Sequence, residues 1–427
     1  MRVAVVTLGT TGDLLPYVAL AQKLRERGHH PYLVVPDSIV ETVEGYGVPA
    51  RPFGDISRDD VEAIIRQLVR ERNLFKHPGI VAGAHARENA EAILRATVEA
   101  TRDADVIVAH NLALMGLGAA ELQRKPLVTV HLFPNLVESQ CMTPDGADFG
   151  RALNALGWTV GRAVVRRSAD PVLNALFRTF GLRERREGML ATGSTALLDV
   201  VAISPSVLPR DPAWPGTVRS TGFWYLDEPA FEPSAELRRF LAGGDPPVIV
   251  TFGSLVGVDA AAMTRTVAAG IADAGCRAIV QAGWQTIGDD TWPRGILKVG
   301  YVPHAWLFPR ALCAITHGGA GTTAAALRAG ISPVAVAHYG DQRFWALHSH
   351  RIGAAPRPLR RDSFTSAAVT DRLRMIVRDT TMKARMRALG ERIRAEDGTG
   401  DAVTLIEHAM AGRGARNSEI LETLFLA

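Results

Sequence analysis

Cysteine, long hydrophobic runs and a secretory leader are scarce or missing in this chain of 427 residues. The three cysteines, Cys141, Cys276 and Cys313, are odd in number and far apart, so they indicate neither a disulfide framework nor a metal-ligand cluster. No apolar run reaches the roughly 18 residues that a membrane-spanning helix needs. The first residues enter an apolar run directly, without the features of a signal peptide. These absences predict a protein of the reducing cytoplasm with no transmembrane segment.

A nucleic-acid-binding pattern is absent as well. Lysine and arginine together number 48 against 44 acidic residues, which leaves a net charge of +4. The basic residues are spread along the chain without a compact tract or interleaved aromatic residues, so we expect no nucleic-acid partner. With 47% hydrophobic and 22% charged residues, the composition is that of a globular protein, and the length favours two domains.

The same local pattern begins twice along the sequence. An apolar strand, a turn of small residues and a helix are expected at 2–7, 8–13 and 14–27, and again at 248–252, 253–255 and 259–274. Gly28 and Gly275 stand where these helices are expected to end, and another strand-like run follows each of them. Strand, helix and strand at this spacing are typical of an open parallel sheet that is covered on both faces. The sequence therefore predicts an α/β protein with two Rossmann-like domains.

The boundary between the domains is expected in a proline-rich stretch, 204–247, which predicts an extended linker with turns. The expected domains are 1–215 and 216–395, and helices within 396–427 are expected to return to the first domain.

Two segments, 55–87 and 135–194, depart from the strand–helix rhythm, and the second is basic and amphipathic. Its apolar residues, such as Trp158 and Phe177, alternate with arginines such as Arg166. One interpretation is a helical lid over an apolar ligand that also touches a membrane surface. The other is a helix pair whose apolar stripe packs on the first domain while the arginines face solvent.

The strongest local signal lies in residues 311–330. A short buried strand (313–316) is followed by the turn 317–321, after which Thr322 and Thr323 open an Ala/Leu helix. A helix N-terminus presents free N–H groups and the positive end of the helix dipole, and both favour an anion. Glycines let the backbone approach that anion closely. The motif predicts a phosphate-binding turn, and the alternative is a tight turn that binds nothing.

Motifs at both ends of the chain resemble a known family. HGGAGTT (317–323), followed by PVAVAHYGDQRFWA (333–346), resembles the donor-binding signature of nucleotide-sugar-dependent glycosyltransferase family one. Members of that family have the GT-B fold, in which two Rossmann-like domains face each other across a cleft. GTTGDLLPYVALAQKLRERGH (9–29) resembles the N-terminal acceptor-domain motif of its bacterial natural-product and sterol glucosyltransferase branch. The likeness fades between about 55 and 200.

The resemblance implies a set of donor-binding residues. For the diphosphate it implies Ser254, His317, Gly319, Gly321, Thr322 and Thr323. For the nucleotide base it implies the backbone of Val302, whereas Trp284 either lines the same pocket or is a core residue. For the sugar it implies Asp341 and Gln342, whose carboxylate and amide can bind neighbouring hydroxyl groups. Taken alone, these two residues would suggest a solvated turn.

The general base must take a proton from the acceptor hydroxyl as that hydroxyl attacks the anomeric carbon. Many family members place a histidine before x-x-Pro in the first strand–helix turn, where this chain has Asp13 after Gly12, as the sterol and glycopeptide branch does. The resemblance makes Asp13 the candidate base and places Gly12 in the acceptor pocket. The competing interpretation is that Asp13 caps the helix, and the two roles are compatible.

Another departure follows the strand at 105–109. Members with a histidine base orient it with a carboxylate there, whereas this chain has His110 and Asn111. A carboxylate base needs no such partner. His110 and His131 could instead touch the acceptor hydroxyl, although we favour core histidines for both.

The resemblance implies inverting transfer of a sugar from a UDP- or dTDP-sugar to a small lipophilic acceptor of natural-product, sterol or glycolipid type. We expect no cofactor beyond the nucleotide-sugar co-substrate, and no metal, because the candidate residues include no metal-binding pair. One rival is a nucleotide-sugar epimerase, which would not need a variable acceptor region. Another is a non-catalytic nucleotide-sugar-binding relative that assists a partner enzyme, which should have lost Asp13 or the turn at 317–323.

Overall fold

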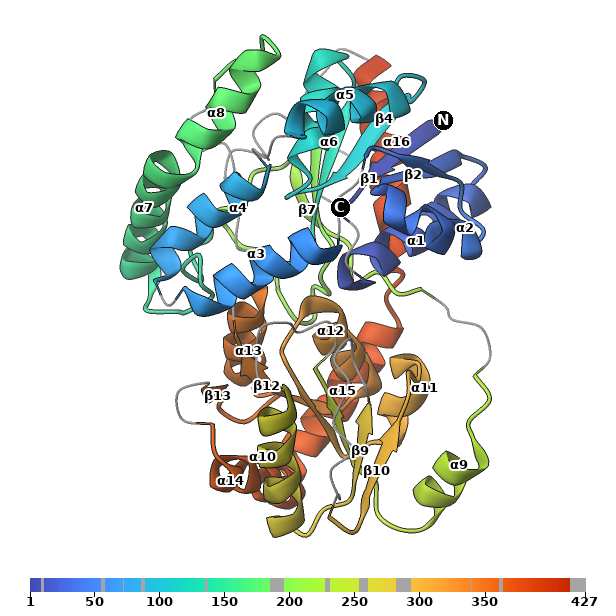
Figure 1. Ribbon diagram of the computed structural model, residues 1–427, viewed down its shortest axis with the longest axis vertical. Helices are drawn as coiled ribbons and strands as arrows, with labels where there is room; N and C mark the ends of the chain where they lie inside the picture. The colour runs from blue at the N-terminus through green and yellow to red at the C-terminus, as the bar shows by residue number, and fades with distance from the viewer. Residues whose placement is uncertain are drawn as a thin grey trace. The chain divides into compact units, whose positions relative to one another are not determined.

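Two parallel β-sheets organise the chain, which Figure 1 shows as a computed structural model. The structure describes residues 1–8, 11–54, 58–71, 73–85, 89–134, 137–184, 196–226, 231–252, 260–281, 293–338, 340–360 and 364–414. At positions 11–13, 58, 61, 74, 85, 260–261, 360 and 413–414 it describes the backbone but not the side chain.

The first sheet has seven parallel strands in the order β3-β2-β1-β4-β5-β6-β7. Its strands are β1 (Arg2–Val6), β2 (His30–Val35), β3 (Ala50–Pro52), β4 (Val106–His110), β5 (Leu127–His131), β6 (Leu198–Val201) and β7 (Val218–Ser220). The helices of this part are α1 (Thr11–Glu26), α2 (Val40–Gly45), α3 (Arg58–Arg70), α4 (His77–His85), α5 (Ala90–Ala100), α6 (Leu114–Leu122), α7 (Arg151–Ser168), α8 (Asp170–Thr179) and α16 (Gly398–Gly414), with short 3-10 turns η1 (Asp37–Ile39) and η2 (Leu74–Lys76).

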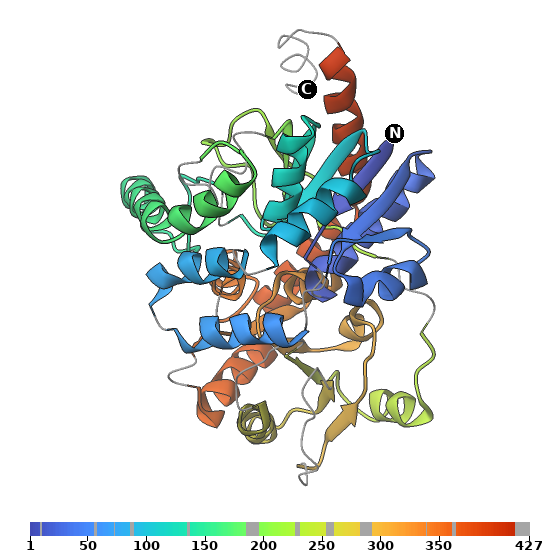
Figure 2. The same cartoon turned by 45° about the horizontal axis from the view of Figure 1, so that its top comes forward.

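Each face of the first sheet has its own apolar core, because successive side chains of a strand point to opposite faces. In β4, Val106 and Val108 enter the core that α1 and α16 cover, whereas Ile107 and Ala109 enter the core that α5 and α6 cover. The last helix, α16, packs directly against α1 (Figures 1 and 2).

The second sheet has six parallel strands in the order β10-β9-β8-β11-β12-β13. Its strands are β8 (Val248–Thr251), β9 (Ala278–Gln281), β10 (Ile296–Val299), β11 (Cys313–Thr316), β12 (Ser332–Ala337) and β13 (Leu359–Arg360). Its helices are α9 (Ala235–Ala242), α10 (Ala260–Asp273), α11 (His304–Leu307), α12 (Ala320–Ala329), α13 (Asp341–Arg351), α14 (Ser366–Arg378) and α15 (Thr380–Arg394), with a 3-10 turn η4 (Phe308–Arg310). The prediction of an α/β protein with two Rossmann-like parts is confirmed.

The chain divides into two compact units. The first comprises residues Met1–Pro144, Asp148–Leu226 and Glu396–Ala427, and the second comprises Asp145–Ala147 and Asp227–Ala395. The division falls after Leu226 rather than after residue 215. The reason is that β7 completes the first sheet and that Trp224, 5% exposed, belongs to the core beneath α1.

A short stretch between β5 and α7 belongs to the second unit. The carboxylate of Asp145 accepts a hydrogen bond from Nε of Arg343 on α13 at 3.0 Å. Gly146, with φ +83°, lies so close to Phe344 that a Cβ there would be 2.8 Å from that ring. A side chain at this position would therefore collide with α13.

The proline-rich stretch is not the extended linker that the sequence predicts, because it contains β7 and α9. Helix α9 begins where the side chain of Ser234 accepts a hydrogen bond from the amide of Leu237. This N-cap stabilises a helix in spite of the prolines around it.

The segment 135–194 forms a helix pair within its described residues. Trp158 of α7 and Leu173 and Phe177 of α8 are buried, and the indole Nε1 of Trp158 donates to the carbonyl of Met142 at 2.8 Å. These apolar residues belong to the packed interior, as in the second interpretation given above. Among the described residues, no helix combines the length and the hydropathy needed to cross a bilayer.

Helices α12 and α15 meet at two glycines. Gly330 ends α12 in the left-handed conformation, with φ +75°, and a Cβ on Gly390 would lie 2.9 Å from the Cα and N atoms of Gly330. Backbone cannot move aside as a flexible side chain can. We predict that Gly390→Ala lowers the free energy of unfolding by about 1–3 kcal/mol through overpacking.

Urea unfolding of the variant beside the wild type measures this loss. Gly83→Ala in α4 is the matched control, because its added Cβ meets nothing within 4 Å and alanine favours helix. Equal stability of Gly390→Ala and the wild type would contradict the close packing.

Candidate active site

The turn after β11 has no room for side chains. Gly318 has φ +86°, and a Cβ there would lie 3.1 Å from the carbonyl oxygen of Gln342. A Cβ on Gly319 would lie 2.5 Å from Nε2 of His317. The amide of Gly318 is fixed by the hydroxyl of Thr316, to which it donates at 3.0 Å. The turn is therefore formed by backbone against the His317 ring.

Helix α12 begins at Ala320, not at Thr322 as the sequence predicted, and Gly319 is its N-cap. Ala320 and Gly321 are small residues that adopt the helical conformation, so the helix extends back to Gly319. The free N–H groups of the first helical turn therefore lie directly beside His317 and Gly319. Thr323 is 1% exposed, and its amide already donates to the carbonyl of Gly319.

His317 is held in the neutral form near pH 7. Burial, followed by the neighbouring His338 and His304, lowers the pKa of His317 to about 4. Its Nδ1 atom is buried and has no hydrogen-bond partner among the described residues, whereas Nε2 lies at the glycine turn. A neutral imidazole can donate one hydrogen bond there without adding a charge.

The two residues expected to bind the sugar lie next to this turn. Asp341 begins α13, and its Oδ2 accepts a hydrogen bond from the amide of Ala320, the first residue of α12, at 3.2 Å. Gln342 is 2% exposed, and its Oε1 accepts from the amide of His338 at 2.9 Å. Two motifs about twenty residues apart in the sequence thus form one cluster. The alternative of a solvated turn is wrong, because Gln342 is buried.

The loop expected to receive the nucleotide base leads into α11. Val302 is 3% exposed and packs in an apolar core with Leu307 and Phe308, so its side chain is not available to a ligand. His304 stacks on Phe308 with ring centroids 4.4 Å apart, and burial lowers its pKa to about 4. Ser254 and Trp284 lie outside the described residues.

The first strand–helix turn of the chain is described only in part. Helix α1 begins at Thr11 rather than at Leu14, so Gly12 and Asp13 belong to its first turn. The interpretation of Asp13 as N-cap is therefore wrong, because the residue stands third in the helix. A carboxylate in a first turn still stabilises a helix through the dipole. The Asp13 side chain lies outside the description.

His110 and His131 both end strands of the first sheet. Nδ1 of His110 accepts from the amide of Leu112 at 3.0 Å, and the ring lies edge-on to Tyr17. Nε2 of His131 lies 3.3 Å from Oδ1 of Asp199, and both side chains are 2% exposed. Both histidines have partners inside the first unit, as core histidines do.

Asp199 was not identified from the sequence. It stands on β6 in register with Thr129 of β5, whose hydroxyl also donates to it. The one feature of the sequence that could have identified Asp199 is that it is an acidic residue inside an apolar strand. Across the described residues, no group of three or more His, Cys, Asp or Glu side chains is arranged to hold a metal ion.

Two family models match separate parts of the chain. A model described as glycosyltransferase family 28 N-terminal domain matches residues 3–140, and one described as erythromycin biosynthesis protein CIII-like, C-terminal domain, matches residues 268–406. A relative, O-mycaminosyltylonolide 6-deoxyallosyltransferase of Streptomyces fradiae, is 31% identical over 421 residues, which cover 95% of this chain and 97% of the relative. The chain belongs to glycosyltransferase family one.

Other relatives of this family-one glycosyltransferase are longer. The sterol 3-beta-glucosyltransferase of Emericella nidulans is 29% identical over 426 residues, 95% of this chain but only 30% of that relative's length. Among solved structures, the glycosyltransferase VinC in complex with DTDP matches with a TM-score of 0.71 and 19% identity, over 96% of this chain and all of that one. The likeness in structure confirms the predicted GT-B fold.

We predict that Gly319→Ala weakens binding of UDP and dTDP by about tenfold or more, a loss of roughly 1.4 kcal/mol. The added methyl would displace the His317 ring and obstruct the start of α12. Isothermal titration of both nucleotides measures the loss, and Gly216→Ala, whose Cβ meets nothing within 4 Å, is the control. Unchanged affinity would show that the turn does not receive the diphosphate.

The lowered pKa values of His317 and His304 also predict an acid-sensitive stability. An unfolded imidazole titrates near 6.5, whereas His317 and His304 have pKa values of about 4 in the folded chain. As the pH falls from 6.5 to 4, the unfolded chain takes up protons that the folded chain cannot, so the free energy of unfolding decreases.

His317→Gln and His304→Gln should each reduce this pH dependence in urea unfolding at pH 7.5, 5.5 and 4.5. The exposed His408→Gln is the control and should follow the wild type. The same slope in all four proteins would refute the buried neutral histidines.

Proposed function

We propose that this glycosyltransferase moves a sugar from a UDP- or dTDP-sugar to a hydroxyl of a small lipophilic acceptor, with inversion and with Asp13 as general base. The observation that supports it best is the 3.2 Å contact between Asp341 and the amide of Ala320. Diphosphate and sugar are covalently joined in such a donor. Their binding groups must therefore be neighbours, as the start of α12 and the Asp341–Gln342 pair are.

The donor diphosphate would be received by the free amides of α12 after Ala320 and by Nε2 of His317. Because Asp341 already accepts from Ala320, a second anion at that same amide would be repelled. The diphosphate therefore belongs on the His317 side, which leaves the carboxylate to the sugar hydroxyls. VinC, whose structure holds DTDP, supports a nucleoside diphosphate ligand.

The departing diphosphate gains negative charge as the glycosidic bond to the sugar breaks. Fixed N–H dipoles at the helix start and a hydrogen bond from His317 can stabilise that charge without reorganisation. We accordingly propose transfer that requires neither a metal nor a cofactor.

The acceptor class follows from the relatives' activities. One relative is named for 6-deoxyallosyl transfer to O-mycaminosyltylonolide and another for 3-beta-glucosyl transfer to sterols. We propose a lipophilic alcohol of natural-product, sterol or glycolipid type. Its hydroxyl oxygen would attack the anomeric carbon from the face opposite the diphosphate while Asp13 accepts its proton. Inversion follows from this single displacement.

We predict that Asp13→Asn lowers the transfer rate by about 10²-fold or more, the usual contribution of a general base, while donor affinity stays unchanged. Transfer from UDP- and dTDP-sugars to a panel of lipophilic alcohols gives the rate, and isothermal titration gives the affinity. Asp59→Asn, an exposed carboxylate in the first turn of α3, is the control and should retain full activity.

Three other outcomes would speak against the proposal. Full transfer by Asp13→Asn would exclude this residue as the base and direct attention to His110 and His131. Donor binding without transfer to any acceptor would favour a nucleotide-sugar-binding auxiliary. Retention of the anomeric configuration in the product would exclude the single displacement.

A further inference from the structure

Helix α7 has a second apolar face that the fold does not bury. Its inner face packs through Trp158 and Val165. On the outer face Leu153 is 55%, Leu156 57% and Val160 41% exposed, and Phe149, just before the helix, is 64% exposed. Leu153, Leu156 and Val160 are spaced by three and four positions, so they lie along one line of the helix surface. Together with Phe149 they are called the α7 stripe.

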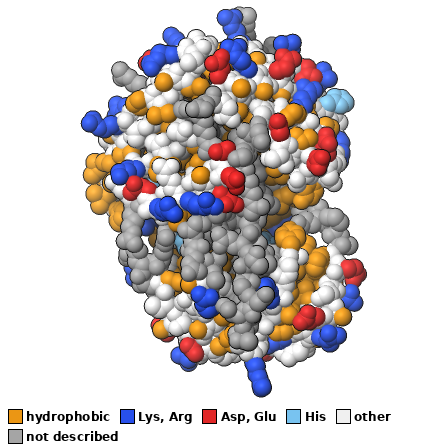
Figure 3. Space-filling view, viewed as in Figure 1, with side chains coloured by type: hydrophobic (Ala, Val, Ile, Leu, Met, Phe, Trp, Pro, Cys, Tyr) orange, Lys and Arg blue, Asp and Glu red, His pale blue; other side chains and the backbone are white. Residues whose placement is uncertain are grey.

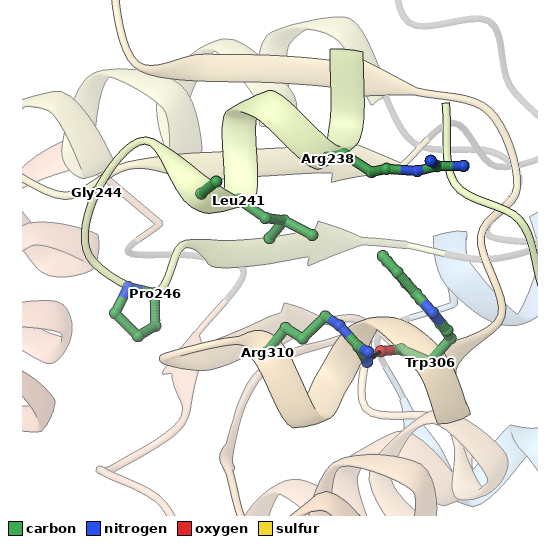
Figure 4. A pocket seen from close by; sticks show the side chains of 7 residues that line it. Arg238, Leu241, Gly244, Pro246, Trp306 and Arg310 are labelled. Carbon is green, nitrogen blue, oxygen red and sulfur yellow. Dashed lines mark hydrogen bonds between the residues drawn. The ribbon is translucent and has the colours of Figure 1, made fainter. Parts of the chain in front are cut away.

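The helix surface around the stripe adds little polarity. The exposed positions that fill the space between the large side chains include Ala152, Ala155 and Ala163. Single exposed leucines are ordinary on protein surfaces, but a contiguous apolar patch marks an interaction site. Figure 3 shows hydrophobic side chains gathered at the edge of the molecule where Figure 1 places α7. Phe75, 60% exposed, adds to the apolar surface on η2, which contacts α7.

The charge along α7 has one sign. The helix contains four arginines and no acidic residue. Arg162 is paired with Glu138 at 2.5 Å, and Arg151 donates to the side chain of Gln140 at 2.6 Å. Arg166 and Arg167 are exposed near the C-terminal end of the helix, so exposed guanidinium groups follow the stripe at that end. An apolar line with arginines beside it is typical of helices that lie in the interface of an anionic membrane.

The size of the stripe disfavours a protein partner. Its helical part, from Leu153 to Val160, is about 11 Å long at 1.5 Å per residue and about 10 Å wide, whereas a stable protein interface buries about 800 Å² on each partner. In a symmetric pair of this chain, the same patch would face itself, so the match in shape would have to be self-complementary over this small area. A lipid surface has neither limitation, because it needs no matching shape and its phosphates attract the arginines.

We propose that the α7 stripe and its flanking arginines dock the first unit on an anionic lipid surface. Phe149, Leu153, Leu156 and Val160 would enter the boundary between headgroups and acyl chains, while Arg166 and Arg167 contact lipid phosphates. The attachment is peripheral, and it is independent of which acceptor the enzyme uses.

The full chain should therefore co-sediment with vesicles of phosphatidylcholine and phosphatidylglycerol, and much less with phosphatidylcholine alone. Leu153→Glu/Leu156→Glu should lower the partition coefficient by about tenfold or more, because charged side chains cannot enter the acyl region. Arg166→Gln/Arg167→Gln should reduce binding to the anionic vesicles only, together with its sensitivity to salt.

A matched control lies in the other unit. Met375 and Val377 on α14 are 47% and 44% exposed, so Met375→Glu/Val377→Glu introduces the same charges at comparable apolar positions and should bind vesicles like the wild type. Thermal unfolding of all variants checks that these surface changes leave the fold intact. Transfer to a water-soluble acceptor, measured without vesicles, separates a failure of the docking proposal from a failure of the proposed function.

Two results would overturn the proposal. The first is vesicle binding that the α7 variants leave unchanged. The second is a wild type that ignores vesicles but forms a dimer in sedimentation equilibrium that Leu153→Glu/Leu156→Glu dissolves, which would assign the stripe to a second copy of the chain.

Discussion

The contact of the glycine turn with the His317 ring is the constraint on which the candidate site depends. Two residues without side chains, Gly318 and Gly319, allow the end of β11, the start of α12 and the start of α13 to come together. The result is a concentration of backbone dipoles beside a neutral imidazole and a carboxylate. A Cβ on Gly318 would crowd the carbonyl of Gln342, and a Cβ on Gly319 would crowd the His317 ring. The arrangement of the site therefore requires glycine at both positions.

The fixed geometry of this turn also explains how a helix N-terminus can bind an anion without a charged side chain. The amides of α12 are fixed by the fold before a ligand arrives, so binding an anion requires little reorganisation. Because burial keeps His317 uncharged, the proposed diphosphate would be bound there without a full ion pair. Under the proposed function, such weak binding would help the enzyme to release its nucleoside diphosphate product after each turnover.

Much of the fold could be predicted from the sequence, because strands and helix ends depend mainly on residues that are neighbours in the chain. The predicted strand at 313–316 has the bounds of β11, and Gly28 and Gly275 have the positive φ angles expected at helix ends. Helix starts were less predictable, since Thr11 and Ala320 belong to turns whose small residues also fit a helix. Helix α9 was hidden because prolines around it dominate the composition.

The contacts that were missed depend on register between distant segments. Asp199 meets His131 only because β6 pairs with β5 in one particular alignment, and Ala320 meets Asp341 only because α13 follows β12 beside β11. The sequence left open, for another reason, whether the apolar residues of 135–194 pack inside the protein or touch a membrane. Helix α7 is apolar on two faces, and a sequence pattern cannot tell which of them the fold covers.

The chain passes more than once between its two units. This path limits how hybrid enzymes can be made from this chain and its relatives. Residues 145–147 are encoded among the elements of the first unit, yet Asp145 and Gly146 pack on α13 of the second. A hybrid that takes residues 227–395 from one parent would thus inherit this loop from the other, and Phe344 would meet a foreign neighbour. Exchange of the second unit between relatives therefore needs four chain junctions rather than two, and the two around the short loop are the easiest to overlook.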